Sequence, residues 1–381
     1  MKYLTEKECR QALQQAQKLV VKAGTSTLTH KTGKFNLARM DRLVRELADQ
    51  VNSGRQVVLV SSGAVGAGMS RLGIKKKPRT LPEKQAAAAV GQGLLMHMYE
   101  KLFNEYGLQV AQILLTRDDL ADRRRYLNAR HTLATLLRLG IVPIVNENDT
   151  VAVEEIQFGD NDTLSALVAG LIDADLLFLL TDTAGLFTAD PEKDQDASLL
   201  SCVSEITPEI EAVAGGAGST WATGGMGTKI QAARLATSFG IPVIIASGLE
   251  QGQISAALAG ETVGTIFLPR DHRTHTRKRW LAFAPPVQGQ IQVDAGAVRA
   301  ICKEGKSLLP GGVTGVQGDF DQGAVVSIID LEGNEIARGL TNYAAAAIKQ
   351  IQGRKTKEIV EILGYKDYDE VVHRDNLIVL A

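Results

Sequence analysis

The stretch IVPIVNENDTVAVEEIQFGDNDTLSALVAGLIDADLLFLLTD, residues 141–182, decides the fold. Two short apolar runs, IVPIVNE and DLLFLLTD, flank a segment with the apolar spacing of a helix, TLSALVAGLI. Apolar runs without polar alternation are typical of strands that are covered on both faces, as in a parallel sheet. The stretch therefore predicts a strand, a helix and a second strand of a largely parallel sheet.

The same alternation extends outward over residues 18 to about 267. Further apolar runs lie at 18–22, 56–62, 110–116, 241–247 and 263–268. Helical segments are expected between them, at 36–54, 82–106 and 118–139, the first capped by Asn36 and stopped by Gly54. This order predicts a three-layer α/β/α sandwich with a mostly parallel, open sheet.

The pattern changes after Phe267. A basic stretch at 269–280 and the sequence APPVQGQ at 284–290 indicate a linker. Beyond it, the short strands IQVD, VVSIID and EIARGL alternate with Gly-rich turns such as LLPGGVTGV, which predicts a small β-rich domain. The expected parts are an N-terminal extension at 1–17, a large domain at 18–268, a linker at 269–286 and a small domain at 287–381.

Composition narrows the class of protein. The 381 residues include 42 Lys and Arg against 43 Asp and Glu, and a net charge of -1 excludes a generally basic nucleic-acid binder. Three distant cysteines, Cys9, Cys202 and Cys302, support neither a disulfide framework nor a cysteine-based zinc site. The chain has no 18-residue apolar run, and its polar N-terminus favours a helix over a signal peptide. We expect a cytoplasmic protein without a membrane partner.

Three glycine-rich segments are candidates for binding phosphate. Lys22 ends a predicted strand before a small-residue turn, and SSGAVGAG at 61–68 and TGGMGTK at 223–229 each precede a helical pattern. Strand exits and tight helix packing also select small residues, and the third segment lacks the Walker A spacing. However, Lys229 falls in the first turn of a helix, where a cation is unfavourable unless an anion neutralises it. That conflict favours a phosphate site.

Acidic and amide residues gather where the predicted strands end. NEND at 146–149 follows one strand, GDND at 159–162 precedes a helix, and Thr181-Asp182 ends another strand. Helix capping by Asp160 or Asp162 and a turn at 148–149 are the ordinary explanations for these residues. Open α/β sheets nevertheless bind ligands at the carboxyl ends of their strands, so these clusters are also candidate ligand groups.

The candidate groups include lysines and loop amides but no evident histidine base, nucleophile elbow or metal-ligand spacing. A carboxylate that accepts a phosphoryl group is already ionised at pH 7 (glutamate pKa about 4.3), so it needs no base. It does need neutralisation of two approaching anions and in-line positioning. Lysines and backbone amides can supply both.

Long segments of the chain resemble the glutamate 5-kinases, a group within the amino-acid kinase family. The resemblance rests on VVKAGTSTLT, SSGAVGAG, LLTRDDLADRRRYLNAR, IVPIVNENDTVAVEEIQFGDND, LLTDTAGLFTADP and TGGMGTKIQAA, in this order and spacing. The C-terminal segments RKRWL, SLLPGGVTGV, ARGLTNY and VVHRDN resemble the PUA domain that follows the kinase domain in many bacterial members. Together, these two resemblances cover nearly the whole chain from Lys18 onward.

The resemblance implies a role for individual residues. Lys22 and Lys229 match two phosphate-neutralising lysines, and Asp162 matches the aspartate that holds them in place. The positions that match the glutamate-binding side are Ser62, Asp149 and Asn161. The positions that match the ATP-binding segments are Lys22, Thr181, Asp182, Thr223, Gly224, Gly225, Met226, Gly227, Thr228 and Lys229. No metal-ligating residue is implied.

The resemblance also implies a reaction and its partners. ATP with Mg²⁺ would phosphorylate the side-chain carboxylate of L-glutamate to L-glutamyl 5-phosphate, the first step of proline biosynthesis. Members of this group are commonly homo-oligomers, dimers or tetramers, and are inhibited by proline. The product could pass directly to a glutamyl phosphate reductase. One departure is Trp221-Ala222, where a small residue and glycine are usual, and Ala222 lacks the backbone freedom of glycine.

Two alternative functions stay open at this point. A kinase of the same fold could act on another acceptor, such as N-acetylglutamate, aspartate or carbamate. Alternatively, the C-terminal domain could make the chain an RNA-binding accessory protein. Against RNA binding, this region lacks an obvious aromatic stacking set, and its basic residues cluster in the linker between Arg270 and Arg279.

Overall fold

The computed structural model describes residues 5–30, 32–74, 76, 78, 80–152, 161–191, 193–194, 196–215, 225–269 and 287–380. The chain forms two compact units, one built mainly from residues up to 273 and the other mainly from residues 274–381. Each unit has its own sheet and its own hydrophobic core.

The larger unit is built on an eight-stranded sheet with the strand order β3-β4-β2-β1-β5-β7-β8-β6. Neighbouring strands are parallel, except that β7 and β8 are antiparallel. Every predicted apolar run forms a strand, and the mostly parallel sheet is confirmed. The bounds are β1 (Lys18–Ala23), β2 (Gln56–Ser61), β3 (Val110–Leu115), β4 (Val142–Glu147), β5 (Leu176–Thr181), β6 (Cys202–Val203), β7 (Val243–Ser247) and β8 (Thr265–Phe267).

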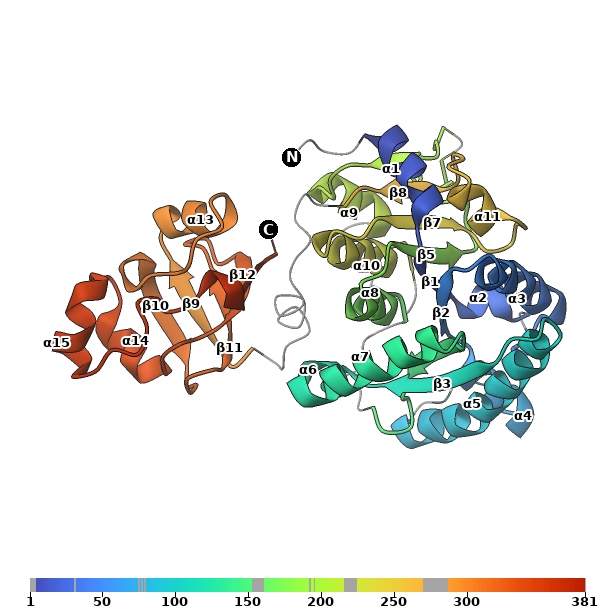
Figure 1. The fold of residues 1–381 in the computed structure, drawn as a ribbon, viewed down its shortest axis with the longest axis horizontal. Helices are drawn as coiled ribbons and strands as arrows, with labels where there is room; N and C mark the ends of the chain where they lie inside the picture. Colours follow the sequence, from blue (N-terminus) through green and yellow to red (C-terminus); the bar gives the residue numbers. More distant parts are fainter. Residues whose placement is uncertain are drawn as a thin grey trace. The chain divides into compact units, whose positions relative to one another are not determined.

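Helices cover both faces of this sheet (Figure 1). On one face, α8 packs on β1, β2, β4 and β5, while α10 packs on α8 and β7. On the other face, α3 packs on β2, α5 packs on α3 and β3, and α11 packs on α3. The bounds are α2 (Thr25–Leu28), α3 (Leu37–Asn52), α4 (Ala64–Leu72), α5 (Leu81–Asn104), α8 (Asn161–Ile172), α9 (Pro208–Gly215), α10 (Met226–Ser238) and α11 (Gln253–Leu258).

The pleat of β1 assigns its side chains to these two faces. Leu19, Val21 and Ala23 belong to the core that β1 shares with α3, α5 and α11. Because successive side chains of a strand point to opposite faces, Lys22 points the other way, toward the layer of α8 and α10. A lysine is thus placed in the interior of the larger unit, where it is buried.

Helix boundaries agree with the sequence in one case and differ in another. Asn36 caps α3 by accepting a hydrogen bond from Arg39 N at 3.2 Å, and Gly54 beyond its end has a φ of +94°, as predicted. The single helix expected over 118–139 is wrong, because α6 (Arg117–Ala121) and α7 (Arg123–Arg138) are separate. Asp122 lies between them, and its Oδ1 accepts from Arg125 N at 2.8 Å. An aspartate that caps a new helix interrupts the old one.

Close packing explains part of the glycine-rich segment at 61–68. A Cβ added to Gly68 in α4 would lie 1.8 Å from Ala87 O in α5, and one added to Gly91 in α5 would lie 1.7 Å from Ala64 O. These two helices can therefore cross only through glycine. Gly63 has a different role, since its φ of +108° turns the chain from β2 into α4.

The N-terminal extension is helical, as predicted, and is anchored to the larger unit. It forms α1 (Glu6–Ala12) and the 3₁₀ turn η1 (Leu13–Gln15). Arg10 is buried, and its guanidinium donates to the carbonyl oxygens of Ser201 (2.8 Å), Val263 (3.2 Å) and Glu261 (3.3 Å). The extension is thus bound near β6 and β8.

The smaller unit is β-rich, as expected, with the strand order β10-β9-β11-β12-β13. The segment 308–316 was expected to be turns, but only its first part is, because Val313 begins a strand that pairs with β9. The bounds are β9 (Gly289–Val293), α13 (Ala295–Cys302), η2 (Pro310–Gly312), β10 (Val313–Gly318), β11 (Val325–Ile329), β12 (Glu335–Leu340), α14 (Ala345–Ile351), η3 (Thr356–Glu358), α15 (Ile359–Leu363), η4 (Arg374–Asn376) and β13 (Leu377–Val379). No helix among the described residues of either unit is long and apolar enough to cross a membrane.

Candidate active site

Two lysines and one aspartate meet inside the larger unit. Lys22 Nζ lies 2.5 Å from Oδ1 of Asp162, and Lys229 Nζ lies 3.1 Å from Oδ2 of the same carboxylate. Thr228 Oγ1 also lies 2.9 Å from Oδ2. All three charged side chains are buried, with 4%, 0% and 4% of Lys22, Asp162 and Lys229 exposed. Lys22 lies near the carboxyl end of β1, and Asp162 and Lys229 lie near the starts of α8 and α10. The cluster therefore lies at the carboxyl ends of the strands.

The charges of this cluster do not balance. Counted together, Lys22, Asp162 and Lys229 carry a formal charge of +1. Burial alone raises the pKa of the Asp162 carboxyl, but the positive charges of Lys22 and Lys229 and the hydrogen bonds to the carboxylate together lower it below its ordinary value of 3.8. Asp162 is therefore ionised, and the remaining positive charge is suited to an anionic group such as phosphate.

Helix and strand ends place these side chains together. Lys22 lies one residue before the end of β1, where it pairs with Val60 of β2 and Leu179 of β5 in the strand register. Asp162 lies in the first turn of α8, where an anion is favourable. Lys229 lies near the start of α10, whose N-cap residue, Gly225, provides no side-chain hydrogen bond. The helix start leaves backbone N–H groups that an anion could bind.

A second polar group lies beside this cluster. Asn161 Nδ2 lies 2.8 Å from Ser62 Oγ, 2.9 Å from Asn146 Oδ1 and 3.3 Å from the backbone oxygen of Ser61. Within the described part of the chain, the buried Oδ1 of Asn161 has no hydrogen-bond partner. The structure thus brings together Ser62 and Asn161, two of the residues that the family resemblance assigns to glutamate binding.

Asp149, the third of those residues, follows β4 in a turn. The backbone N–H groups of Val151 and Ala152 donate to the oxygen of Asn148, so the turn expected at 148–149 is present. Asp149 is half-buried, and burial raises the pKa of its carboxyl despite the opposing charge of Lys84. No hydrogen bond joins Asp149 to Ser62 or Asn161 among the contacts described.

Apart from Lys22 and Lys229, the predicted ATP-binding residues that the structure describes lie at the end of β5 and at the start of α10. Thr181 ends β5 and is buried, with its hydroxyl 3.1 Å from Oδ1 of the exposed Asp182. Thr228 Oγ1 lies 2.7 Å from Gly225 O at the start of α10. The other predicted positions there, Met226 and Gly227, are half-buried in the first turn of α10, while Asp160, Trp221, Ala222, Thr223 and Gly224 lie outside the described residues.

Two polar residues that contact the second polar group, Gln92 and Tyr99, were not among the candidates from the sequence. Asn146 Nδ2 donates to Gln92 Oε1 at 2.8 Å, and the hydroxyls of Ser61 and Tyr99 lie 2.8 Å apart, buried. Gln92 and Tyr99 both belong to α5. A glutamine between two glycines in the otherwise small and apolar stretch AAAAVGQGLL was the available signal for Gln92.

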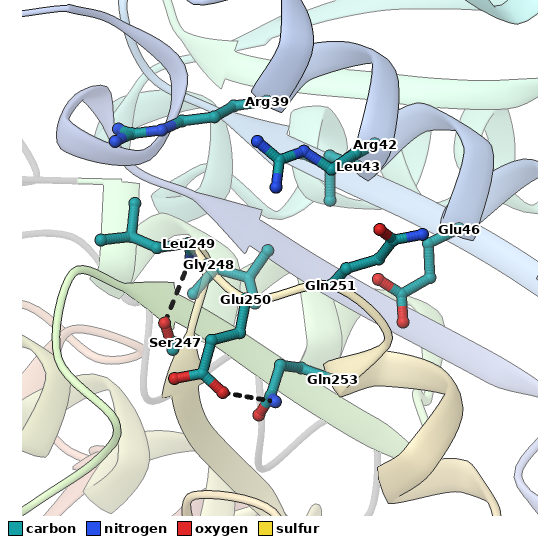
Figure 2. A pocket seen from close by; sticks show the side chains of 11 residues that line it. Arg39, Arg42, Leu43, Glu46, Ser247, Gly248, Leu249, Glu250, Gln251 and Gln253 are labelled. Carbon is teal, nitrogen blue, oxygen red and sulfur yellow. Dashed lines mark hydrogen bonds between the residues drawn. The ribbon is translucent and has the colours of Figure 1, made fainter.

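A separate pocket lies on the face of the sheet that α3 covers. It is formed between α3 and the segment after β7, near the carboxyl ends of β5 and β7 (Figure 2). It holds about 360 Å³ of space that is partly open to solvent. Figure 2 shows Arg39 and Arg42 on one side, with Ser247 and Glu250 below them. Arg39 and Arg42 are matched in charge by Glu46 and Glu250, so the pocket lacks the excess positive charge found around Lys22. We therefore place the candidate active site at the lysine cluster.

Comparisons with known proteins agree with this fold. The family model described as the amino acid kinase family matches residues 17–247, and the PUA domain model matches residues 289–363. A glutamate 5-kinase from Moorella thermoacetica is 80% identical over 378 residues, which cover 99% of this chain and 100% of the relative. A glutamate 5-kinase from Carboxydothermus hydrogenoformans is 56% identical, over 97% of this chain and 100% of the relative.

A solved structure supports the fold alone. The carbamate kinase from Giardia lamblia bound to AMP-PNP matches with a TM-score of 0.51 and 19% sequence identity. The match covers 67% of this chain and 99% of that chain, and at this identity it shows the fold alone. The family model covers more than half of the chain, and the two bacterial relatives match it over nearly its full length. From this evidence, the chain belongs to the amino acid kinase family, with a C-terminal PUA domain.

Proposed function

We propose that this chain is a glutamate 5-kinase, which transfers the γ-phosphoryl group of ATP to the side-chain carboxylate of L-glutamate. The product is L-glutamyl 5-phosphate, and the reaction is the first step of proline biosynthesis. Its full-length similarity to glutamate 5-kinases supports this assignment over kinases for N-acetylglutamate, aspartate or carbamate.

The observation that carries the chemistry is the pair of buried lysines on Asp162. The glutamate carboxylate is ionised at pH 7 and can attack without a base, but it must approach an anionic phosphoryl group. Lys22 and Lys229 lower this barrier by stabilising charge on the transferred oxygens. Asp162 holds both ammonium groups in place, so little reorganisation is needed when the reaction occurs.

The nucleotide site is proposed along Thr181, Asp182 and residues 223–229. The start of α10 and Lys229 offer backbone N–H groups and an ammonium group to phosphate oxygens. Asp162 does not fit a metal ligand, because its two oxygens already face ammonium groups. Mg²⁺ commonly binds through substrate phosphates, and we propose that ATP carries it. When bound, the ion would neutralise part of the phosphate charge.

The acceptor site is proposed at Ser62, Asn161 and Asp149. Ser62 and Asn161 contact each other beside the lysine cluster. The buried Oδ1 of Asn161 has no hydrogen-bond donor among the described residues and could accept a hydrogen bond from a substrate. Asp149 supplies a carboxylate, for which the ammonium group of an amino acid is a suitable partner.

Regulation and assembly are proposed on the same basis. Proline, as an amino acid, would compete at the acceptor site, and the enzyme would work in the cytoplasm as a homo-oligomer, a dimer or tetramer. Acyl phosphates hydrolyse readily, which favours direct transfer of the product to a glutamyl phosphate reductase.

A hydroxylamine-trapping assay tests the proposal. The purified protein is incubated with Mg-ATP, hydroxylamine and one acceptor at a time: L-glutamate, N-acetylglutamate, aspartate or carbamate. We expect hydroxamate from L-glutamate, and suppression by proline. Hydroxamate from only another of the carboxylates, or ADP release with carbamate alone, would overturn the acceptor assignment while leaving the lysine roles intact.

A further inference from the structure

Three side-chain amides form a chain that leads from α5 to the acceptor site. Gln92 Oε1 in α5 accepts from Asn146 Nδ2 in β4 at 2.8 Å. Asn146 Oδ1 in turn accepts from Asn161 Nδ2 in α8 at 2.9 Å. Gln92 and Asn146 are buried, with 8% and 2% of their surfaces exposed. Gln92 in α5 is thereby connected, through Asn146, to Asn161 beside the lysine cluster.

Backbone groups fix the direction of this chain. The N–H of Glu147 donates to Asn146 Oδ1 at 2.9 Å, and a backbone N–H can only donate. The Nδ2 of Asn146 must therefore face Gln92, and Gln92 must accept this hydrogen bond through its Oε1. At the other end, the backbone oxygen of Ser61 lies 3.3 Å from Asn161 and can only accept, so Nδ2 of Asn161 faces it. The amide orientations follow from these contacts.

The orientation leaves Asn161 with its oxygen unused. Its Nδ2 is engaged by Asn146 and Ser62, while its Oδ1 is buried without a partner in the described ranges. A buried acceptor without a donor is unfavourable, so a ligand that supplies a donor there would be stabilised. In an α-amino acid the strong donor is the α-ammonium group.

We propose that Gln92 is a positioning residue for the acceptor amino acid. Its Oε1 holds the Asn146 amide, which holds Asn161 so that Oδ1 is presented to the α-ammonium group. Gln92 acts through Asn146 and does not touch the acceptor. The hydrogen bonds from Gln92 through Asn146 to Asn161 are called the amide relay, or relay, below. The identity of the acceptor rests on the proposed function, but the relay itself does not.

Substitution of Gln92 separates this role from simple packing. Gln92→Leu removes the oxygen, so Asn146 loses its acceptor and Asn161 its fixed partner. We expect the KM for L-glutamate to rise roughly tenfold or more, with the KM for ATP and kcat changed less than about threefold. Gln92→Glu restores an oxygen that accepts from Asn146 whether or not it is protonated, and should recover most of the affinity for glutamate.

Two further variants keep the experiment decisive. Gln50→Leu removes another buried glutamine of the larger unit, which contacts Ser255 and Arg55, and should lower stability without raising the KM for glutamate. Gln92→Met, which is unbranched like glutamine, replaces Gln92→Leu if the leucine variant does not fold. Thermal unfolding of each variant accompanies the kinetics.

The possible outcomes are distinct. Equal rises in the KM for glutamate and ATP, or an unchanged KM for both, would overturn the proposal. An impairment of Gln92→Glu as large as that of Gln92→Leu would also overturn it, because it would assign the role to Nε2. If the wild-type protein phosphorylates a different amino acid and not glutamate, the proposed function fails. The same variants then test the relay with that acceptor.

Discussion

The ammonium group of Lys22 lies 2.5 Å from Oδ1 of Asp162, an ion pair between the end of strand β1 and the first turn of helix α8. The second oxygen of the same carboxylate lies 3.1 Å from Lys229 Nζ. One buried carboxylate thus holds two ammonium groups at the sheet edge. A change in any of the three residues should act on phosphoryl transfer more than on substrate binding.

Lys229→Met should lower kcat by at least about 100-fold, because it removes the charge that we propose stabilises the transferred phosphoryl oxygens. The KM for glutamate should change much less. Steady-state kinetics check this, with Lys18→Met as the control, since Lys18 starts β1 at the opposite end from the site. An unchanged kcat would exclude the role of Lys229.

Asp162→Asn should lower the free energy of unfolding at pH 7 by about 3 kcal/mol, because two buried ammonium groups lose their partner. Burial alone would raise the pKa of Asp162, but Lys22, Lys229 and hydrogen bonds lower it below 3.8. The unfolded chain then binds the proton at a higher pH than the folded one, so stabilisation is complete above about pH 5. It is lost as the pH falls through the lower folded-state pKa.

Urea unfolding from pH 7 to pH 3 checks the Asp162 prediction. The difference between wild type and Asp162→Asn should shrink below about pH 4. A difference that stays constant over this range would mean that the carboxylate is not the group responsible.

Asp149→Asn should raise the KM for glutamate about tenfold or more and leave the KM for ATP nearly unchanged. Burial raises the pKa of the Asp149 carboxyl. The ionised carboxylate therefore lowers the free energy of unfolding, and this effect is complete above the folded-state pKa. The variant should therefore be no less stable than wild type at pH 7, by thermal unfolding. A KM effect confined to ATP would contradict the assignment to the acceptor site.

Gly91→Ala should destabilise the larger unit by more than about 2 kcal/mol, because its Cβ would lie 1.7 Å from Ala64 O across the contact of α4 and α5. Gly93→Ala on the same helix is the matched control. Nothing lies within 4 Å of a Cβ at Gly93, so alanine there should stabilise by about 0.5–1 kcal/mol. Similar values for the two variants in chemical denaturation would show that the helices can separate.

Arg10→Met should lower the free energy of unfolding by about 2–3 kcal/mol without changing kcat, because three backbone oxygens lose a buried guanidinium. Arg45→Met provides the comparison. Arg45 is exposed and pairs only with Asp41 and Tyr106 among the described contacts, so its loss should cost less than about 0.5 kcal/mol. A fall in kcat for Arg10→Met would mean that the N-terminal extension affects the site.

Most elements of the larger unit could be predicted because each one carries its own signal. Apolar runs marked the strands, and Asn36 and Gly54 marked the ends of α3. The break at Asp122 was missed, since an aspartate within the charged run DDLADRRR can either continue a helix or cap a new one. Strand β6 was missed because two residues carry no period.

The sequence by itself determined the three-layer architecture, the family and the placement of polar residues at strand ends. These properties depend on local periodicity and on motifs that are contiguous in the chain. From the residues alone, Asp162 could equally have been a helix cap, and Gln92 carried only a weak signal. The tertiary structure decided that Asp162 meets Lys22 and Lys229, and that Gln92 meets Asn146. Such contacts depend on which helix covers which face of the sheet, and the order of β1, β4 and β5 sets that arrangement.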